Sequence, residues 1–476
     1  MWEDVTALLT RPAVELAELV RTGQVRSREL VEAALRQIER HADLNAFTLV
    51  EAEPALAAAD AVPSGDPRPF AGVPIAIKEL NPVVGQRLTF GSDLFDEYRP
   101  GYDGYAVRRL RDAGFVFVGR TSAPEFGIVP VTEPRRFGPT RNPWDRERTP
   151  GGSSGGAAAA VAAGILPVAQ GSDGGGSIRV PAACCGLVGL KASRGRISSG
   201  PDAGDNFLAT NGALTRGIAD AGALLDVLAG YEPGDATWAP APAEAFAVSA
   251  RRESGRLRIA MTTASPIGTP VNPICARAVH DAAQLLASLG HEIVEVTPPD
   301  WVSPQLEPAF LVLYAAGIAS GVRFGASLRR RPPQPDDVES LTWMFYEQGI
   351  RYSAAELVEA MTRLQGHARS LVAFLAGYDA LLTPPLAQRP LRIGELDTCG
   401  ADPRAEFQKA EVFAPFAAVF NVTGQPAISL PLYQGEDGLP LGVQLAGRPL
   451  GEGPLLALAA QLEAALPWAG RVPSPA

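Results

Sequence analysis

Lysine and histidine are scarce in this chain of 476 residues. Among its 42 basic residues only three are lysines, Lys78, Lys191 and Lys409, and the others are arginines. This shortage is typical of a codon bias towards arginine, so a lysine that persists is a candidate for a role that arginine cannot take. Arginine stays protonated in proteins and cannot act as a base, whereas a lysine can lose its proton.

Long runs of basic residues are also absent. The net charge is −10, and the densest basic cluster, 329–331, lies next to prolines. Nucleic acids and anionic membranes attract extended basic surfaces, so we expect neither as a partner. The N-terminus carries acidic residues where a signal peptide would carry positive charge. The longest weakly polar stretch, 157–168, is too short to span a bilayer.

Cysteine is rare as well, and its positions show no metal-ligand spacing. The four cysteines are Cys184, Cys185, Cys275 and Cys399. Reduced, buried thiols are the default for such a protein, and the expected location is the cytoplasm. We expect no metal and no organic cofactor.

The hydrophobic pattern predicts an α/β protein. Residues 1–42 read as helical, and short apolar runs then alternate with helices. The runs 73–78 and 115–119 are expected to be buried strands on either side of a helix at 106–113. Such alternation is typical of an α/β domain. Further strands are expected near 378–382 and 427–445, with several helices over 300–375.

Glycine, serine and alanine dominate residues 138–200, which differ from the rest of the chain. Composition alone would allow a flexible linker. However, the segments LPVAQ and CCGLVGL are apolar and continuous, which a linker does not need. Glycines among apolar runs more often mark a close approach of the backbone, or amides directed at a ligand.

The first serine arrangement in this region is GGSSG at 151–155, which formally matches the G-x-S-x-G nucleophile elbow with Ser153 as the nucleophile. That motif requires a buried strand before the serine, but the preceding segment is charged and contains proline. It also requires a histidine base, and His280, His291 and His367 have no suitable setting. An esterase of the α/β-hydrolase type is therefore the weaker alternative.

The second arrangement uses Ser177, Ser153 and Lys78. Ser177 follows three glycines, Gly174, Gly175 and Gly176, whose amides can form an oxyanion hole. Lys78 ends an apolar strand, where burial lowers the pKa of a lysine towards neutrality and allows it to act as a base. Ser153 can relay the proton between them. This arrangement needs no histidine.

Three segments of this region resemble the signature of the amidase signature family. They are GGSSGG at 151–156, GSDGGGSIRVPA at 171–182 and GLVGLK at 186–191. The separation of 24 positions between Ser153 and Ser177 and the segment FAGVPIAIKE around Lys78 match as well. The likeness covers most of residues 20–230 and 378–465.

The resemblance implies a Ser–cisSer–Lys triad. Ser177 would be the nucleophile, Ser153 the bridging serine after a cis peptide bond with Gly152, and Lys78 the base. The oxyanion donors would be the amides of Gly174, Gly175, Gly176 and Ser177. The mechanism would be hydrolysis of a carboxylic amide through an acyl-enzyme. Asp173 and Arg179 match positions that the family uses to support the glycine-rich loop.

The resemblance also implies the architecture. We expect one amidase domain over 1–476, with a mixed central sheet that helices cover on both faces. Within it, N-terminal helices occupy 1–60, the catalytic signature core occupies 61–230, and a variable helical insert at 300–375 forms part of the substrate pocket. The chain departs from the family pattern at Glu79, where aspartate is usual, and at Gly174, where a larger residue is usual.

Within the family, GRISSGP at 195–201 and TEPRRFGPTRNPW at 132–144 resemble bacterial hydrolases of the 6-aminohexanoate cyclic dimer type, whose relatives include aryl acylamidases and urethanases. The resemblance implies a small-molecule amide or carbamate substrate and a monomer or homodimer. The alternative within the family is the A subunit of a tRNA-dependent amidotransferase. We expect an apolar pocket lined by residues of the variable segments: Ile128, Val129, Phe207, Leu208, Phe310, Tyr314, Trp343 and Phe345.

Overall fold

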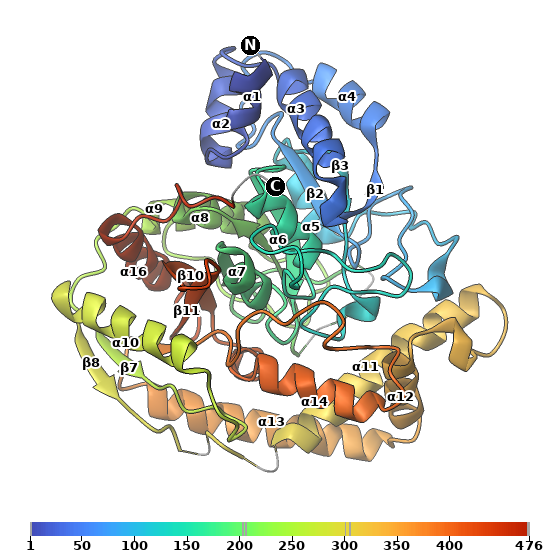
Figure 1. Cartoon of the computed structure of the whole chain (residues 1–476), viewed down its shortest axis with the longest axis vertical. Helices are drawn as coiled ribbons and strands as arrows, with labels where there is room; N and C mark the ends of the chain where they lie inside the picture. Colours follow the sequence, from blue (N-terminus) through green and yellow to red (C-terminus); the bar gives the residue numbers. More distant parts are fainter. Residues whose placement is uncertain (1, 202–203, 205–206, 300, 304–305, 474–476) are drawn as a thin grey trace.

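Helices surround a large mixed sheet in this protein, whose computed structural model describes residues 2–201, 204, 207–299, 301–303 and 306–473 (Figure 1). The sheet has eight strands in the order β4-β6-β5-β10-β11-β9-β7-β8. The strand β7 pairs in parallel with β8 and β9, and the other pairs are antiparallel. The strands are β4 Val168–Asp173, β5 Val188–Lys191, β6 Thr210–Thr215, β7 Arg258–Met261, β8 Glu292–Glu295, β9 Ala380–Thr383, β10 Ala427–Gln434 and β11 Pro440–Gly447.

Three more strands form a separate small sheet in the order β1-β3-β2. They are β1 Phe47–Val50, β2 Pro74–Lys78 and β3 Val116–Thr121. Every residue of β2 and β3 is buried, as predicted from the two apolar runs. The Gln170 side chain of β4 links the large sheet to this one, because its Oε1 accepts a hydrogen bond from the Lys78 amide of β2 at 2.9 Å.

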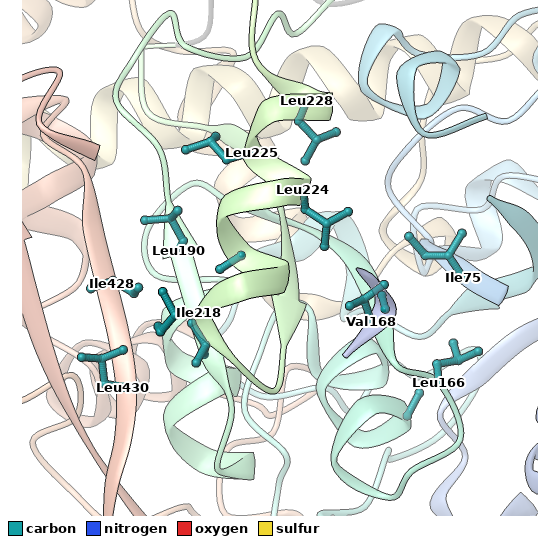
Figure 2. Close-up of a cluster of buried hydrophobic side chains, with 14 of the residues drawn as sticks. Ile75, Leu166, Val168, Leu190, Ile218, Leu224, Leu225, Leu228, Ile428 and Leu430 are labelled. Atoms are coloured by element: carbon teal, nitrogen blue, oxygen red, sulfur yellow. The ribbon is translucent and has the colours of Figure 1, made fainter. Parts of the chain in front are cut away.

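Alternate side chains of the large sheet enter two different cores. Val168 belongs to the larger core, whereas the next residue, Ala169, packs in a second core on the other side. This alternation follows from the pleat of a strand. Figure 2 shows the larger core, in which Leu224 of α8 lies near Val168. The helices that contribute to it include α8 Ile218–Leu228, α10 Pro273–Ser288 and α16 Glu452–Ala465.

The second core lies between two groups of helices, those that follow the glycine-rich turns and those of the later insert. The short helices α6 Gly155–Ala162 and α7 Arg179–Cys185 are buried along their whole length. In Figure 1 these helices lie in the centre of the molecule, and the later insert lies below them. The insert helices are α11 Leu306–Leu328, α12 Ser340–Gly349 and α13 Ala354–Leu375. After strand β9 follow α14 Pro403–Phe413 and α15 Ala418–Thr423.

The longest apolar helix is α11, which is long and apolar enough to cross a membrane by length and composition. The expectation that 157–168 is the longest weakly polar stretch is therefore wrong. Buried residues of α11, including Ala315 and Val322, pack in the second core, where α12 also contributes Leu341 and Phe345. The apolar character of α11 thus serves contacts within the fold.

The N-terminal residues form helices as predicted. They are α1 Trp2–Leu8, α2 Ala13–Arg21, α3 Ser27–Arg40 and α4 Ala52–Asp60, and the remaining helices are α5 Tyr105–Asp112 and α9 Phe246–Ser249. A buried contact fixes the N-terminal helices to the rest of the molecule, because the Ala13 and Val14 amides donate to the Asp220 carboxylate of α8.

Candidate active site

Lys78 ends strand β2 and is completely buried. Its Nζ lies 2.8 Å from Ser153 Oγ and 3.1 Å from Ser172 Oγ. Burial lowers the pKa of Lys78 to about 7, and the Asp173 carboxylate opposes this shift only in part. A lysine that loses its proton near neutral pH and contacts a serine hydroxyl can accept the proton of that hydroxyl.

Ser153 follows Gly152, and the peptide bond between them is cis, as the resemblance implies. The Ser153 side chain is buried in a turn that leads into α6. Only glycine fits at position 152, because a Cβ there would lie 2.4 Å from the Val131 carbonyl oxygen. Close backbone approach therefore explains this glycine of the motif.

The glycine-rich loop after β4 is held by a buried ion pair between Asp173 and Arg179. Arg179 donates to both carboxylate oxygens of Asp173, and its Nη2 also donates to Asn421 Oδ1 at 2.7 Å. Burial by itself would raise the pKa of Asp173, but the Arg179 guanidinium, the Asn421 hydrogen bond and the Lys191 charge together hold that pKa well below its usual range. The two residues support the loop, as the resemblance implies.

One predicted oxyanion donor is wrong. The Gly176 amide donates to Asp173 Oδ1 at 2.8 Å, so it is already committed to the loop scaffold. Gly176 has a φ of 125° and packs so tightly on Ala417 that an added Cβ would lie 2.5 Å from the Ala417 Cβ. The amides of Gly174, Gly175 and Ser177 are left as the candidate donors.

Ser177 and Ser153 line the same cavity, which has a volume of about 790 Å³. Ser177 is half-buried, and its carbonyl accepts a hydrogen bond from the Ser154 amide at 3.1 Å. This bond ties the loop that carries Ser177 to the turn that carries Ser153. Most of the predicted pocket residues line the cavity as well, namely Ile128, Val129, Phe207, Leu208, Phe310 and Tyr314.

Two predicted pocket residues, Trp343 and Phe345, do not line the cavity. Trp343 packs against Tyr346, with ring centroids 5.0 Å apart. Phe345 is fully buried and lies behind Tyr314, with ring centroids 5.6 Å apart. Phe345 therefore supports the cavity wall from behind, because it packs on the lining residues Tyr314 and Phe407.

Sequence reasoning missed several residues near the site. Ser172 contacts Lys78 directly, and its place within the GSDGGGS motif next to Asp173 was the available signal. Gln170 orients the end of β2 through the Lys78 amide. Glu411 also lines the cavity, and no motif marks it.

The nucleophile-elbow alternative does not fit this geometry. The described residues 142–150 before the turn form turns and isolated bridges instead of a strand. Ser153 contacts a lysine, and no histidine is found among the described residues that line the cavity. His291, for example, contacts Gln461 at 2.8 Å in another part of the protein.

A buried lysine paired with a serine, beside a glycine-rich loop at a cavity, is an arrangement suited to acyl transfer by an α/β enzyme. A family model described as Amidase matches residues 29–456. The chain belongs to the amidase family, whose named members hydrolyse amide bonds.

Individual relatives agree with the family assignment. A 6-aminohexanoate-cyclic-dimer hydrolase from Paenarthrobacter ureafaciens is 37% identical, covering 99% of this chain and 97% of that protein. The structure of a 6-aminohexanoate cyclic dimer hydrolase complexed with substrate has a TM-score of 0.93 at 36% identity, covering 98% of this chain and 99% of that one. A bacterial aryl acylamidase has a TM-score of 0.87 at 26% identity, with 98% and 99% covered.

The amidotransferase alternative is less favoured. The A subunit of the glutamyl-tRNA(Gln) amidotransferase from Thermotoga maritima has a TM-score of 0.79 at 30% identity, covering 99% of this chain and 98% of that one. Both the TM-score and the identity are below those of the cyclic dimer hydrolase structure. The chain is therefore closer to a hydrolase than to the amidotransferase component.

Proposed function

We propose that this protein is a serine amidohydrolase that cleaves small-molecule carboxylic amides through an acyl-enzyme on Ser177. The observation that carries the proposal is the 2.8 Å contact between buried Lys78 and Ser153, next to the cavity that Ser177 lines. A lysine with a pKa of about 7 is neutral in a large fraction of molecules at physiological pH. It therefore has the proton affinity that a general base needs.

In the proposed reaction, neutral Lys78 takes a proton from Ser153, and Ser153 takes the proton of Ser177. The Ser177 oxygen forms a bond to the amide carbon, and the amides of Gly174, Gly175 and Ser177 stabilise the oxyanion. The relay then returns the proton to the leaving nitrogen, and the carbon–nitrogen bond breaks. Water attacks the resulting ester by the same relay, which releases the acid and restores Ser177.

The lining of the cavity suits substrates with apolar acyl or amine groups. Phe207, Phe310 and Phe407 all line it, and the relatives named above act on a cyclic oligoamide and on aryl amides by their names. We propose that the substrates include aryl amides and oligoamides and extend to carbamates and esters. Turnover restricted to short polar amides would contradict this substrate class.

A panel of p-nitroanilides, esters and carbamates tests the proposal with the purified chain alone. We expect release of amine from apolar amides by the wild type, and no release by Ser177→Ala. Ser154→Ala is the matched control, because Ser154 lies beside the bridging serine but contacts the backbone of Ser172. Activity that persists in Ser177→Ala and disappears in Ser154→Ala would overturn the assignment of the nucleophile.

We also propose that the enzyme works in the cytoplasm as a monomer or homodimer, without a nucleic-acid or membrane partner. Three free cysteines, Cys184, Cys185 and Cys275, are buried, which is consistent with a reducing compartment. Burial raises the pKa of the Cys275 thiol to about 11, so this thiol stays protonated and unreactive. Size-exclusion chromatography with light scattering tests the oligomeric state.

A further inference from the structure

Polar groups gather at two parts of an otherwise apolar cavity. One part holds the glycine-rich loop and the serines 153, 172 and 177. Elsewhere in the cavity, the described lining residues include two carboxylates, Glu307 of α11 and Glu411 of α14, and no lysine, arginine or histidine. Many of the other described lining residues are apolar, such as Phe310 and Phe407. A carboxylate in such a wall requires an explanation, because desolvating a charge is costly.

Glu411 lies on the face of α14 that turns towards the cavity. Phe407, Ala410 and Ala414 line the cavity with it, at the separations of three and four residues that place side chains on one helical face. The Glu411 side chain is only 21% exposed. Its carboxylate accepts none of the hydrogen bonds found among the described residues 2–201, 204, 207–299, 301–303 and 306–473.

Arg404 forms an ion pair with each of the two carboxylates, and its contact with Glu307 is the closer one. Arg404 Nη2 donates a hydrogen bond to Glu307, whereas its separation from Glu411 Oε2 is 3.7 Å. The cluster therefore contains two carboxylates and one guanidinium. Burial and the Glu307 charge raise the pKa of Glu411 to about 7, and Arg404 opposes this shift. The cluster carries a net negative charge when both carboxylates are ionised.

We infer that Glu411 selects amide substrates that carry an ammonium group remote from the scissile bond. This inference rests on the proposed function, since the amide must lie at Ser177 while the ammonium lies at Glu411. The ammonium would donate the hydrogen bonds that Glu411 lacks and would balance the net negative charge of the cluster. Carboxylate-bearing substrates would be disfavoured, because they would add a third negative charge.

Chain connectivity limits the distance between Glu411 and the glycine-rich loop. Ala417 touches Gly176 of the glycine-rich loop, and it follows Glu411 by only six positions. Six residues span at most about 20 Å, so the Cα atoms of Glu411 and Ala417 are no farther apart than that. An extended amino-oligoamide covers distances of this order. The ammonium can belong either to the acyl part or to the leaving amine, and the experiment must separate the two.

The test compares kcat/KM for matched amides with and without the charge. The acyl arm uses ω-aminoacyl p-nitroanilides against acyl p-nitroanilides of equal chain length, over a series of lengths. The amine arm uses phenylacetyl amides of diaminoalkanes against those of simple alkylamines, with ω-carboxyl compounds as a third set. We expect the ammonium compounds to be preferred in one arm, at one range of chain length, and the carboxyl compounds to be the poorest.

Variants assign the preference to Glu411. We expect Glu411→Gln to lower the ratio of ammonium to neutral kcat/KM at least about tenfold, as for loss of a hydrogen-bonded charge. Arg404→Gln should change the ratio in the opposite direction, because it removes the competing cation. Glu359→Gln is the control, since Glu359 lies on α13 with a side chain 67% exposed and should leave the ratio unchanged. Equal ratios in Glu411→Gln and the wild type would overturn the inference.

The pH dependence of the same ratio gives a second readout. The groups that face Glu411 are Glu307 of α11 and Arg404 of α14. Glu411 binds an ammonium when it is ionised, so the preference should increase as the pH rises through about 7. Taking a ratio cancels the ionisation of Lys78, which affects both substrates. A ratio that does not change with pH would contradict the role of Glu411.

Failure of the inference can be distinguished from failure of the proposed function. Turnover of neutral amides without any ammonium preference would overturn the inference alone. If the wild type cleaves no amide at all, the proposed function is wrong. In that case, isothermal titration of Ser177→Ala with the intact ammonium and neutral amides still decides the inference, because equal affinities would refute it and tighter binding of the ammonium amide would support it.

Discussion

Two buried lysines of this protein differ in what surrounds them. Lys78 and Lys191 are each almost completely inaccessible to solvent, and burial lowers the pKa of each to about 7. The Lys78 amine contacts Ser153 next to the substrate cavity. The Lys191 amine donates to the carbonyl of Ala192 at 2.8 Å, and Arg179 lies near enough to lower its pKa further.

The comparison shows that burial and a lowered pKa do not by themselves make a lysine a base. Both lysines can lose their proton near neutrality, but only Lys78 contacts a hydroxyl group that leads to the cavity. Lys191 lies at the end of β5, next to the ion pair that supports the glycine-rich loop. We therefore expect Lys78 to act in the reaction and Lys191 to act in the structure.

The largest expected effect is that of Lys78→Ala. We expect kcat on apolar p-nitroanilides to fall about 10³-fold or more, because general bases contribute about 10²–10⁴-fold to the rate. Circular dichroism should show a folded protein, since the removed amine carries a desolvation cost. Near-normal turnover in this variant would contradict the proposed mechanism and would remove the contrast between the two lysines.

The next largest effect is expected from breaking the ion pair between Asp173 and Arg179, which lies near Lys191. Asp173→Asn leaves the Arg179 charge without its partner, and breaking a buried ion pair costs about 3–5 kcal/mol. We expect a loss of this size in the free energy of unfolding in urea. We also expect a fall of about 10–100-fold in kcat, because the Gly176 amide is held by the same carboxylate. A destabilised variant with unchanged kcat would show that the loop does not depend on this ion pair.

The pH profile of the wild type should report the ionisation of Lys78. We expect kcat/KM for a neutral amide to rise about tenfold per pH unit below its midpoint and to level off above pH about 7, as the lysine loses its proton. Stopped assays from acid to alkaline pH measure this limb. A profile that decreases through pH 7 would mean that the protonated lysine is the active form.

The smallest effect on the reaction is expected from Lys191→Met. We expect kcat/KM to change less than about threefold, with the pH limb in place. The stability should differ instead. The folded pKa of Lys191, about 7, lies below the usual lysine value of 10.5, so wild-type stability rises as the pH increases between these values. In the variant, the increase in the free energy of unfolding with pH should be smaller by up to about 1.4 kcal/mol per pH unit.

Lys78→Met is the matched comparison for that measurement. It should reduce the same stability slope, because the two lysines have the same lowered pKa. It should also abolish turnover, which Lys191→Met does not. If Lys191→Met lost activity to the same extent as Lys78→Met while remaining folded, the distinction between the two lysines would be wrong.

The sequence predicts the local structure around Lys78 and the serines well, because that structure depends on local motifs. The strand at 73–78 is apolar throughout and ends in Lys78, and the glycine-rich turns are adjacent to their serines. Each of these features depends on nearby residues. The confirmed β2 strand is of this kind, whereas the confirmed cis bond before Ser153 is implied only by the resemblance to the amidase signature family.

The cavity is harder to predict because it depends on contacts between distant elements. Trp343 and Phe345 are two residues apart on α12, so they lie on different helical faces, and neither faces the cavity. Glu411 lines it instead, because α14 presents the face that also carries Phe407. Which backbone amides of the glycine-rich loop are free to face the site also depends on tertiary contacts. The Gly176 amide, for example, donates its hydrogen bond to Asp173.

The most direct test of the account is the attachment site of a serine-directed fluorophosphonate probe, mapped by peptide mass spectrometry. The account predicts an adduct on Ser177 in the wild type and in Lys191→Met, formed at similar rates, and none in Lys78→Ala over the same time. An adduct on Ser153, or equal labelling of Lys78→Ala and the wild type, would contradict the claim that Lys78 activates Ser177.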